Sequence, residues 1–322
     1  MPRPTIKTIA AAIGVAPNTV SLSLRDSPLV APDTKRRVLE EAARQGYQRD
    51  ALAQSLRYGR SHTIALAFGD VGNPLFAIRI KLLAQVFRGH GYQTFILNTD
   101  EDPATEQAAL RTAVERKVDG VVLCPCQENR EALALLHRCG VPCVLLGRQF
   151  DPPLEDAVVW DDREGGRLAT QWLLERGCRR IAHLTASQDI SSARLRLLGY
   201  EEALRQGGLT ADPALIKQVS PLGNVKEALK GLPADCDGIF AFNDLLAWEA
   251  MALRPDLLFA GFDDIQARLR APVKLTSIGA DLEAEAREAA QALLRRIREP
   301  ETPVNTAVLP VSLVQRSPGP AS

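Results

Sequence analysis

The chain has 322 residues, 46% of them hydrophobic, and its 39 basic and 39 acidic side chains give a formal net charge of +0. This length allows two or three domains, and no apolar run reaches the ~18 residues that a membrane-spanning helix needs. The first residues also lack the apolar core of a signal peptide, so we expect a cytoplasmic protein with no membrane partner. The six cysteines contain no C-x-x-C pair, which favours reduced, mostly buried thiols, no metal site and no cofactor.

The stretch from residue 5 to residue 24 predicts two short helices joined by a sharp turn. Thr5 can cap the first helix, Gly14 can take the positive φ of a sharp helix end, and Pro17 fits the first position of the second helix. This pattern predicts a helix-turn-helix whose second helix presents small polar side chains to a DNA groove. Its predicted small core consists of Ile9, Val15, Val20 and Leu24. The candidate DNA contacts in this stretch are Thr5, Pro17, Asn18, Thr19, Ser21 and Leu22.

A third helix is expected over Asp33–Gln45, with Tyr47 plugging the core after its end. Its inward residues are expected to be Val38, Leu39, Ala42 and Ala43. A short helical piece, Asp50–Leu56, and a polar joint, Arg57–Ser61, come next. Residues 1–60 carry ten basic and five acidic side chains, a net charge of +5, so the rest of the chain carries −5. A basic head on an acidic body suits a head that contacts phosphates.

From Thr63 onward, apolar runs of strand length alternate with amphipathic helices. Strands are expected at 63–68, 93–97, 120–124, 142–146 and 158–160, with helices between them. The alternation then repeats, with helices at 163–176, 191–206, 225–230 and 245–253, each followed by a strand. The pattern predicts an α/β body made of two doubly wound halves that join near Trp160.

Polar side chains follow the predicted strands at the ends where ligands of parallel sheets bind. Acids, amides, an arginine and an aromatic ring suit the hydroxyls and the flat face of a sugar or a nucleoside. Any one of these residues alone could equally be a loop cap or a surface charge. The candidate ligand-binding residues are Asp70, Asn73, Phe76, Arg148, Asp161, Ser192, Arg196, Asn243 and Asp263.

Several of these stretches resemble the lactose/galactose repressor (LacI/GalR) family of bacterial transcription regulators. They are V-A-P-N-T-V-S in the second helix, the helix ending in G-Y, A-Q-S-L before the joint, N-P-L-F (73–76), R-L-L-G-Y (196–200), F-A-F-N-D (240–244) and G-F-D-D-I (261–265). The resemblance implies a body like the periplasmic binding proteins, with three crossings between two lobes. It implies that 284–298 returns to the first lobe and that the closing strand L-P-V-S-L-V-Q-R-S lies in the second.

The same resemblance implies roles for particular residues. Arg196, Asn243 and Asp263 would contact a small effector in the cleft, and the aromatic Phe76 would pack on it. Residues 50–56 would form a hinge helix when two copies meet on DNA. In that hinge, Ala53 and Leu56 would contact DNA, with Leu56 as a minor-groove wedge.

The sequence departs from the family at several positions. Ala16 and Leu22 stand where members usually carry Ser and Arg, so the preferred DNA sequence should differ at one step. Arg49-Asp50 replaces the usual Pro-Asn, although Asp is still a good helix cap. Gly147 stands where many members have an Asp, which removes one hydroxyl acceptor. The segment 244–262 is shorter than usual, and no tetramerising heptad follows the last strand.

We therefore expect a homodimeric, sequence-specific DNA-binding regulator, a repressor whose affinity for double-stranded operator DNA is controlled by a sugar or nucleoside-like effector. The expected domains are a helix-turn-helix head at 1–49, a hinge and linker at 50–61 and a ligand-binding, dimerising body at 62–322. A solute-binding protein or an enzyme on the same fold is the alternative. No G-x-S-x-G, H-E-x-x-H, P-loop or G-x-G-x-x-G motif occurs, so we expect no catalytic residues.

Overall fold

The computed structural model describes residues 4–47, 60–127, 130–219, 225–269 and 274–316. The chain forms two compact units, Met1–Ser61 and His62–Ser322. The expected hinge helix at 50–56, with Ala53 and Leu56, lies outside the described residues. Within the described part of the chain, none of the helices has the length and apolarity needed to span a membrane.

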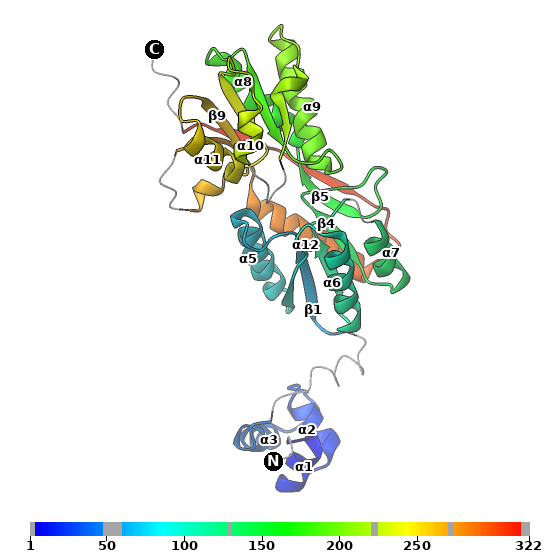
Figure 1. The fold of residues 1–322 in the computed structure, drawn as a ribbon. Helices are drawn as coiled ribbons and strands as arrows, with labels where there is room; N and C mark the ends of the chain where they lie inside the picture. The colour runs from blue at the N-terminus through cyan, green and yellow to red at the C-terminus, as the bar shows by residue number, and fades with distance from the viewer. Residues whose placement is uncertain (1–3, 48–59, 128–129, 220–224, 270–273, 317–322) are drawn as a thin grey trace. The chain divides into compact units, whose positions relative to one another are not determined.

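The described residues of the first unit form three helices, α1 (Ile6–Ile13), α2 (Pro17–Ser23) and α3 (Pro32–Arg44), as Figure 1 shows. Thr5 caps α1, because its hydroxyl accepts a hydrogen bond from the Thr8 backbone N–H at 3.2 Å. Gly14 ends the helix at φ +70°, a left-handed conformation that favours glycine. The predicted helix-turn-helix is confirmed, and its core contains Ile9, Ala10, Val20, Val38 and Ala42, with Val15, Leu24 and Tyr47 partly buried against them.

Two residues of α3 were wrongly expected to face inward. The Leu39 side chain is 52% exposed, and Ala43 is also exposed. Each follows a buried residue, Val38 or Ala42, and successive residues of a helix differ by about 100° in direction. The small core of the described head buries only a narrow stripe of α3, so the neighbouring apolar positions remain at the surface.

The first lobe of the body is a parallel sheet with helices on both faces (Figure 1). Its strand order is β11-β5-β4-β3-β1-β2. The strands are β1 (Thr63–Phe68), β2 (Gln93–Asn98), β3 (Gly120–Leu123), β4 (Cys143–Leu146), β5 (Asp156–Trp160) and β11 (Thr306–Leu309). The helices are α5 (Pro74–Gly89), α6 (Pro103–Glu115), α7 (Arg130–Arg138) and α12 (Leu282–Arg298).

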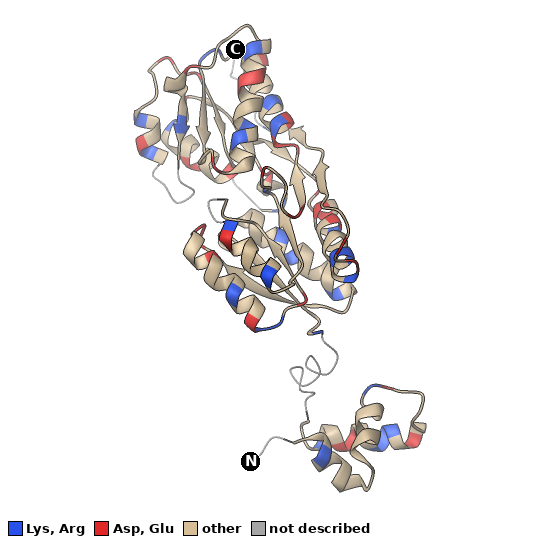
Figure 2. Ribbon diagram, turned by 90° about the vertical axis from the view of Figure 1, so that its right-hand side faces the viewer, with Lys and Arg blue, Asp and Glu red and all other residues tan. Residues whose placement is uncertain are grey.

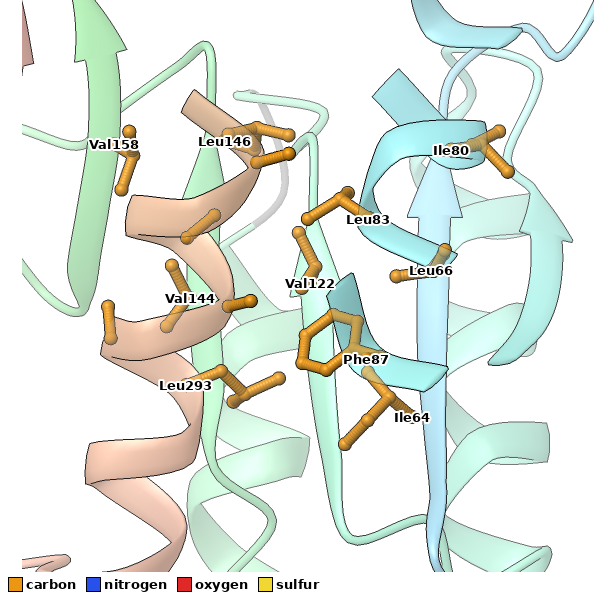
Figure 3. Packing of buried hydrophobic residues seen from close by; sticks show 14 of the residues in the cluster. Ile64, Leu66, Ile80, Leu83, Phe87, Val122, Val144, Leu146, Val158 and Leu293 are labelled. Carbon is orange, nitrogen blue, oxygen red and sulfur yellow. The ribbon is translucent and has the colours of Figure 1, made fainter. Parts of the chain in front are cut away.

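Alternate residues of the inner strands, β1, β3, β4 and β5, pack against opposite helix layers. On one face, Leu66 and Val122 meet Leu83 and Phe87 of α5 and Leu293 of α12 (Figure 3). On the other face, the intervening strand residues pack against α6 and α7; they include Ala65, Ala67, Val121, Leu123 and Leu145. Burial on both faces explains why these strands read as continuous apolar runs.

The second lobe repeats this plan with the strand order β12-β10-β9-β8-β6-β7. Its strands are β6 (Ile181–Thr185), β7 (Ile216–Gln218), β8 (Gly238–Ala241), β9 (Leu258–Phe262), β10 (Thr276–Gly279) and β12 (Ser312–Val314). Its helices are α8 (Asp162–Glu175), α9 (Ser191–Gln206), α10 (Val225–Lys230) and α11 (Asp244–Leu253), with short 3₁₀ turns at Pro213–Leu215 and Ile265–Ala267. Among the described residues of this lobe, the strand pairs are parallel except that of β12 with β10.

The chain crosses between the lobes three times, after β5, after β10 and between β11 and β12, as expected. The return of α12 to the first lobe and the position of β12 in the second are both confirmed. The sequence pattern missed β11 as a strand of the first sheet. Pro310 separates β11 from β12, because its nitrogen cannot donate a hydrogen bond to a neighbouring strand. The apolar pattern of the sequence continues across Pro310.

Candidate functional site

A cavity of about 460 Å³ opens at the carboxyl ends of the strands of both lobes. This volume lies in the range of small-molecule sites, roughly 300–1,000 Å³. Eight of the nine ligand-binding candidates line it: Asp70, Asn73, Phe76, Arg148, Ser192, Arg196, Asn243 and Asp263. The strand-end rule therefore brings residues from positions 70 to 263 to one place.

The local fold fixes two of these residues as helix caps. The side-chain oxygen of Asn73 accepts from the Leu75 backbone N–H at 3.0 Å, and that of Asn243 accepts from the Leu246 N–H at 2.9 Å. Each asparagine follows a strand and begins a helix, α5 or α11. Each asparagine is therefore both a helix cap and part of the cavity wall, the two roles that the sequence allowed.

Arg196 is buried in the second-lobe wall and makes several contacts. Its Nε donates to Oδ1 of Asp162 at 2.9 Å, and Nη1 donates to the carbonyl oxygen of Phe242. Its Nη2 lies 4.0 Å from Oδ1 of Asp263, and the guanidinium carbon lies 3.4 Å from the centre of the Phe262 ring. These contacts hold the arginine fork in one orientation before any ligand arrives.

Asp263 combines an unusual backbone conformation with a carboxyl group whose pKa is raised. Its backbone φ is +102°, a left-handed value that is rare for a residue other than glycine. Burial raises the pKa of its carboxyl to about 7, although the nearby Arg196 opposes that shift. Burial also raises the pKa of Asp162, again against the effect of Arg196. A strained, poorly solvated carboxylate is typical of a functional site.

Arg148 reaches the cavity as part of an ion pair. Its Nη1 and Nη2 donate to the two carboxylate oxygens of Glu101 at 2.6 and 2.8 Å, and Nη1 also donates to the Pro125 carbonyl oxygen at 3.0 Å. The arginine predicted from sequence therefore lies in the cavity wall with its charge already matched.

Sequence reasoning missed Arg79, which lies in the same wall. Its Nε and Nη2 donate to the Glu285 carboxylate at 2.8 and 2.6 Å, and its guanidinium lies 4.9 Å from the centre of the Trp160 ring. A Cβ atom on Gly147 would lie 2.9 Å from Nη1 of Arg79. Arg79 therefore occupies the space beside Gly147, the position at which the family resemblance implies an Asp in many members. The available clue was its spacing, one helical turn after Phe76.

The structure places Asp162, and not Asp161, in the cavity wall. Asp161 caps α8, where its Oδ1 accepts from the Glu164 N–H at 3.0 Å, and it borders a separate polar groove between α8 and α9. No local pattern distinguishes these two neighbouring aspartates. Other lining residues that it missed include Glu101, Gln127, Trp160, Asp189, Ile190 and Phe242.

In the head, the candidate residues of α2 differ in exposure. Pro17 and Asn18 are exposed, whereas Thr19, Ser21 and Leu22 are half-buried. Arg25 donates to the Ser21 hydroxyl at 3.1 Å, and this adds a positive charge beside the helix. Figure 2 marks the charged residues of these helices, several of which form ion pairs on α3 and the preceding loop: Lys35–Asp26, Arg36–Asp33 and Arg44–Glu41.

Neither the cysteines nor the acids form a metal site within the described ranges, where no group of three or more His, Cys, Asp or Glu side chains could hold an ion. None of the six cysteines, all of which the structure describes, forms a disulfide, and five of them are buried. Cys139 is the exposed one.

The family described as "Periplasmic binding proteins and sugar binding domain of LacI family" matches residues 61–248. The chain belongs to the LacI/GalR family. The regulator CelR of Thermobifida fusca is 31% identical over 98% of both chains, and the repressor PurR of Aliivibrio salmonicida is 28% identical over 92% of both. As a LacI/GalR protein, the chain is a DNA-binding transcriptional regulator controlled by a small effector.

Solved structures agree with the fold of this LacI/GalR protein. A CelR–cellobiose complex is 27% identical with a TM-score of 0.68 and covers 98% of this chain and 99% of its own. A lac repressor dimer bound to operator and the anti-inducer ONPF has a TM-score of 0.81, covers 98% of both chains and is 21% identical. At that identity the second likeness concerns the fold alone.

Proposed function

We propose that this LacI/GalR protein is a cytoplasmic, homodimeric repressor whose cavity binds a sugar and whose paired heads bind a near-palindromic operator. The observation that carries the ligand proposal is the buried set around Arg196, with Asp162 and Asp263, at the wall of the cavity. The fixed guanidinium group of Arg196 beside the Asp263 carboxyl suits adjacent hydroxyl groups of a ligand, which need both hydrogen-bond donors and acceptors.

The remaining candidates complete a sugar site. Asp263 and Asn243 would exchange hydrogen bonds with hydroxyls, and Asp70, Asn73 and Ser192 would bind other hydroxyls from elsewhere in the cavity wall. Phe76 packs against Phe68 with ring centres 5.5 Å apart, which holds it as an apolar wall for the ring face. The CelR relative crystallised with cellobiose supports a sugar over a nucleoside.

The head would read DNA through α2. Exposed Asn18 suits the N6/N7 edge of adenine, and Leu22 suits a thymine methyl. The net +5 charge of residues 1–60 predicts affinity that falls steeply with salt, because bound lysines and arginines release counterions. Thr5, Pro17, Thr19 and Ser21 would position the helix, and Ala53 and Leu56 would contact the centre of the site.

We assign the cavity no catalytic role. Its Asp162 and Glu101 carboxylates are held by arginines, which keeps them as structural acceptors. The relatives named above are transcriptional regulators, which also favours binding over catalysis.

A binding experiment on the full chain tests this proposal. Calorimetric titration with a panel of mono- and disaccharides, and with nucleosides, should find one sugar that binds the wild type. Arg196→Ala should lose that binding by at least about 10-fold, because it leaves buried Asp162 unpaired as well as removing ligand contacts. Arg163→Ala is the matched control, since that arginine lies on α8 outside the cavity and pairs with Glu202.

Operator binding separates the two halves of the proposal. Arg196→Ala should select the same DNA from a random pool as the wild type. A nucleoside that binds in place of any sugar would correct the ligand class, and sugar binding that survives in Arg196→Ala would show that the cavity assignment is wrong.

A further inference from the structure

Every arginine that lines the cavity already has a carboxylate partner. Arg79 is paired with Glu285, Arg148 with Glu101 and Arg196 with Asp162, at 2.6 to 2.9 Å. The lining residues of the described chain include no lysine. An arriving anion would therefore meet no unmatched positive charge in this wall.

Acids outnumber arginines around the cavity, six to three, among the residues described. Three of the acids have no arginine or lysine partner in the described ranges: Asp70, Asp100 and Asp189. Their oxygens accept only from neutral groups nearby, such as the Gly72 N–H at 2.8 Å for Asp70 and the Ser187 hydroxyl at 3.2 Å for Asp189. In a partly enclosed site this excess of negative charge repels an anion more strongly than it would in bulk water.

The Glu101–Arg148 pair is built into the fold. A Cβ atom on Gly69 would lie 2.2 Å from Oε1 of Glu101, so glycine at the end of β1 leaves the space that this carboxylate fills. The fork of Arg148 is then occupied on both Nη atoms. The neutralisation of Arg148 therefore depends on Gly69 and Glu101, which lie far from Arg148 in the sequence.

We infer that this cavity admits uncharged or amino-substituted sugars and rejects sugar acids and sugar phosphates, because each arginine of its wall is already paired with a carboxylate, as Arg148 is with Glu101. The part of this inference that names sugars as the ligands rests on the proposed function. The exclusion of anions rests on the charges of the wall alone.

Two neighbouring substitutions test this charge selection. Glu101→Gln removes one negative charge and releases the charge of Arg148 into the cavity. Asp100→Asn removes the same charge from the adjacent residue, which also lines the cavity but has no arginine partner among the described residues. Both variants keep the size of the side chain, and both carry an unaltered head, so any phosphate effect on the head cancels in the comparison.

The probe is inorganic phosphate, titrated into the full chain against chloride at equal ionic strength, with thermal unfolding and calorimetry as readouts. Phosphate should bind Glu101→Gln on the order of 10-fold to 100-fold more tightly than wild type or Asp100→Asn, as expected for a charge-assisted bidentate contact. Equal phosphate binding by all three proteins would overturn the role of Glu101, and tight, saturable phosphate binding to the wild-type body would overturn the exclusion of anions.

A sugar series separates this inference from the proposed function. D-glucose, D-glucosamine, D-glucuronate and D-glucose 6-phosphate, and the same substitutions on whichever sugar the wider panel identifies, are titrated into wild type and Glu101→Gln. Preference of the wild type for an acid or phosphate form over its neutral parent would overturn the inference and leave a sugar site. If no sugar binds, the proposed function fails, while the phosphate comparison still decides the question of charge.

Discussion

The carboxyl group of Asp263 is costly to bury in the ligand-free protein. Its pKa is raised to about 7 by burial, from an ordinary value near 3.8. The folded state therefore binds a proton more tightly than the unfolded state between about pH 4 and pH 7. Stability falls as pH rises through this window, because the unfolded chain loses its proton first. A group kept at such a cost is expected to serve the ligand.

Asp263→Asn should therefore stabilise the ligand-free protein at pH 8, by up to about 4 kcal/mol for a shift of this size, and should weaken sugar binding. Urea unfolding at pH 5 and pH 8 measures the first effect, and calorimetry measures the second. The difference in free energy of unfolding between the two pH values should shrink in the variant.

Glu106 supplies a matched control for this prediction. Burial raises the pKa of Glu106 to about 7 as well, but this residue does not line the cavity. Glu106→Gln should also flatten the pH dependence and should leave sugar affinity unchanged. If Asp263→Asn keeps full sugar affinity, Asp263 is only a structural acid and the site assignment is wrong.

Leu22 stands at the position of α2 where the family resemblance implies an arginine. Leu22→Arg should shift the preferred base to guanine at one symmetric pair of operator positions, worth about 1–3 kcal/mol of discrimination. Selection of DNA from a random pool measures this shift. Leu39→Arg adds the same charge on an exposed position of α3 and should only tighten binding to all sequences. An unchanged selected motif in Leu22→Arg would show that residue 22 does not face the bases.

At the scale of elements, the crossing of α8 and α9 sets where Arg196 lies. A Cβ atom on Gly166 would lie 2.2 Å from the Arg196 carbonyl oxygen, and one on Gly199 would lie 2.0 Å from the Arg163 carbonyl oxygen. Both contacts are with backbone, which cannot move aside as a flexible side chain does. The two helices therefore approach closely only because glycine occupies both positions.

Gly199→Ala should push α9 away from α8 and move Arg196 out of register with Asp162. We expect a loss of about 1–3 kcal/mol of stability, as for other overpacked sites, together with weaker sugar binding. Gly89→Ala is the control, since a Cβ atom there meets nothing within 4 Å. It should be neutral or stabilise by up to about 1 kcal/mol. Unaltered stability and sugar affinity in Gly199→Ala would show that the crossing tolerates separation.

Several elements could be predicted from sequence because their patterns are local. Thr5, Gly14 and Pro17 mark helix ends by their own backbone preferences, and the apolar runs of β1 and β3 follow from burial on both faces. The strand-end rule then identified eight of the residues that line the cavity. It could not separate Asp161 from Asp162, because one residue of helix decides which of them faces the cavity.

Other features depend on contacts that no local pattern carries. Arg79 and Glu285 are 206 positions apart, and each looks like an ordinary surface residue of its helix. Similarly, β11 and β12 form one apolar run in sequence and join different sheets in the fold. The pairing of Arg148 with Glu101 also could not be predicted from the sequence, although it decides whether the charge of Arg148 is available to a ligand.

At the scale of the whole molecule, we expect that sugar bound in the body changes the affinity of the head for operator, and that operator changes the affinity for sugar. Coupling of this kind is a free energy shared by the two sites, so it must be reciprocal. If sugar changes operator affinity by some factor, then operator must change sugar affinity by the same factor. A typical coupling of 1–3 kcal/mol corresponds to about 5-fold to 150-fold.

The measurement that tests this claim most directly is a closed thermodynamic cycle on the full chain. Fluorescence anisotropy gives the Kd for labelled operator with and without saturating sugar, and calorimetry gives the Kd for sugar with and without operator. We predict that the two ratios agree and exceed about 5-fold in the wild type. In Arg196→Ala, the sugar-free operator Kd should be unchanged and sugar should no longer shift it. An operator Kd that sugar leaves unchanged in the wild type, or that sugar shifts equally in Arg196→Ala, would contradict the account.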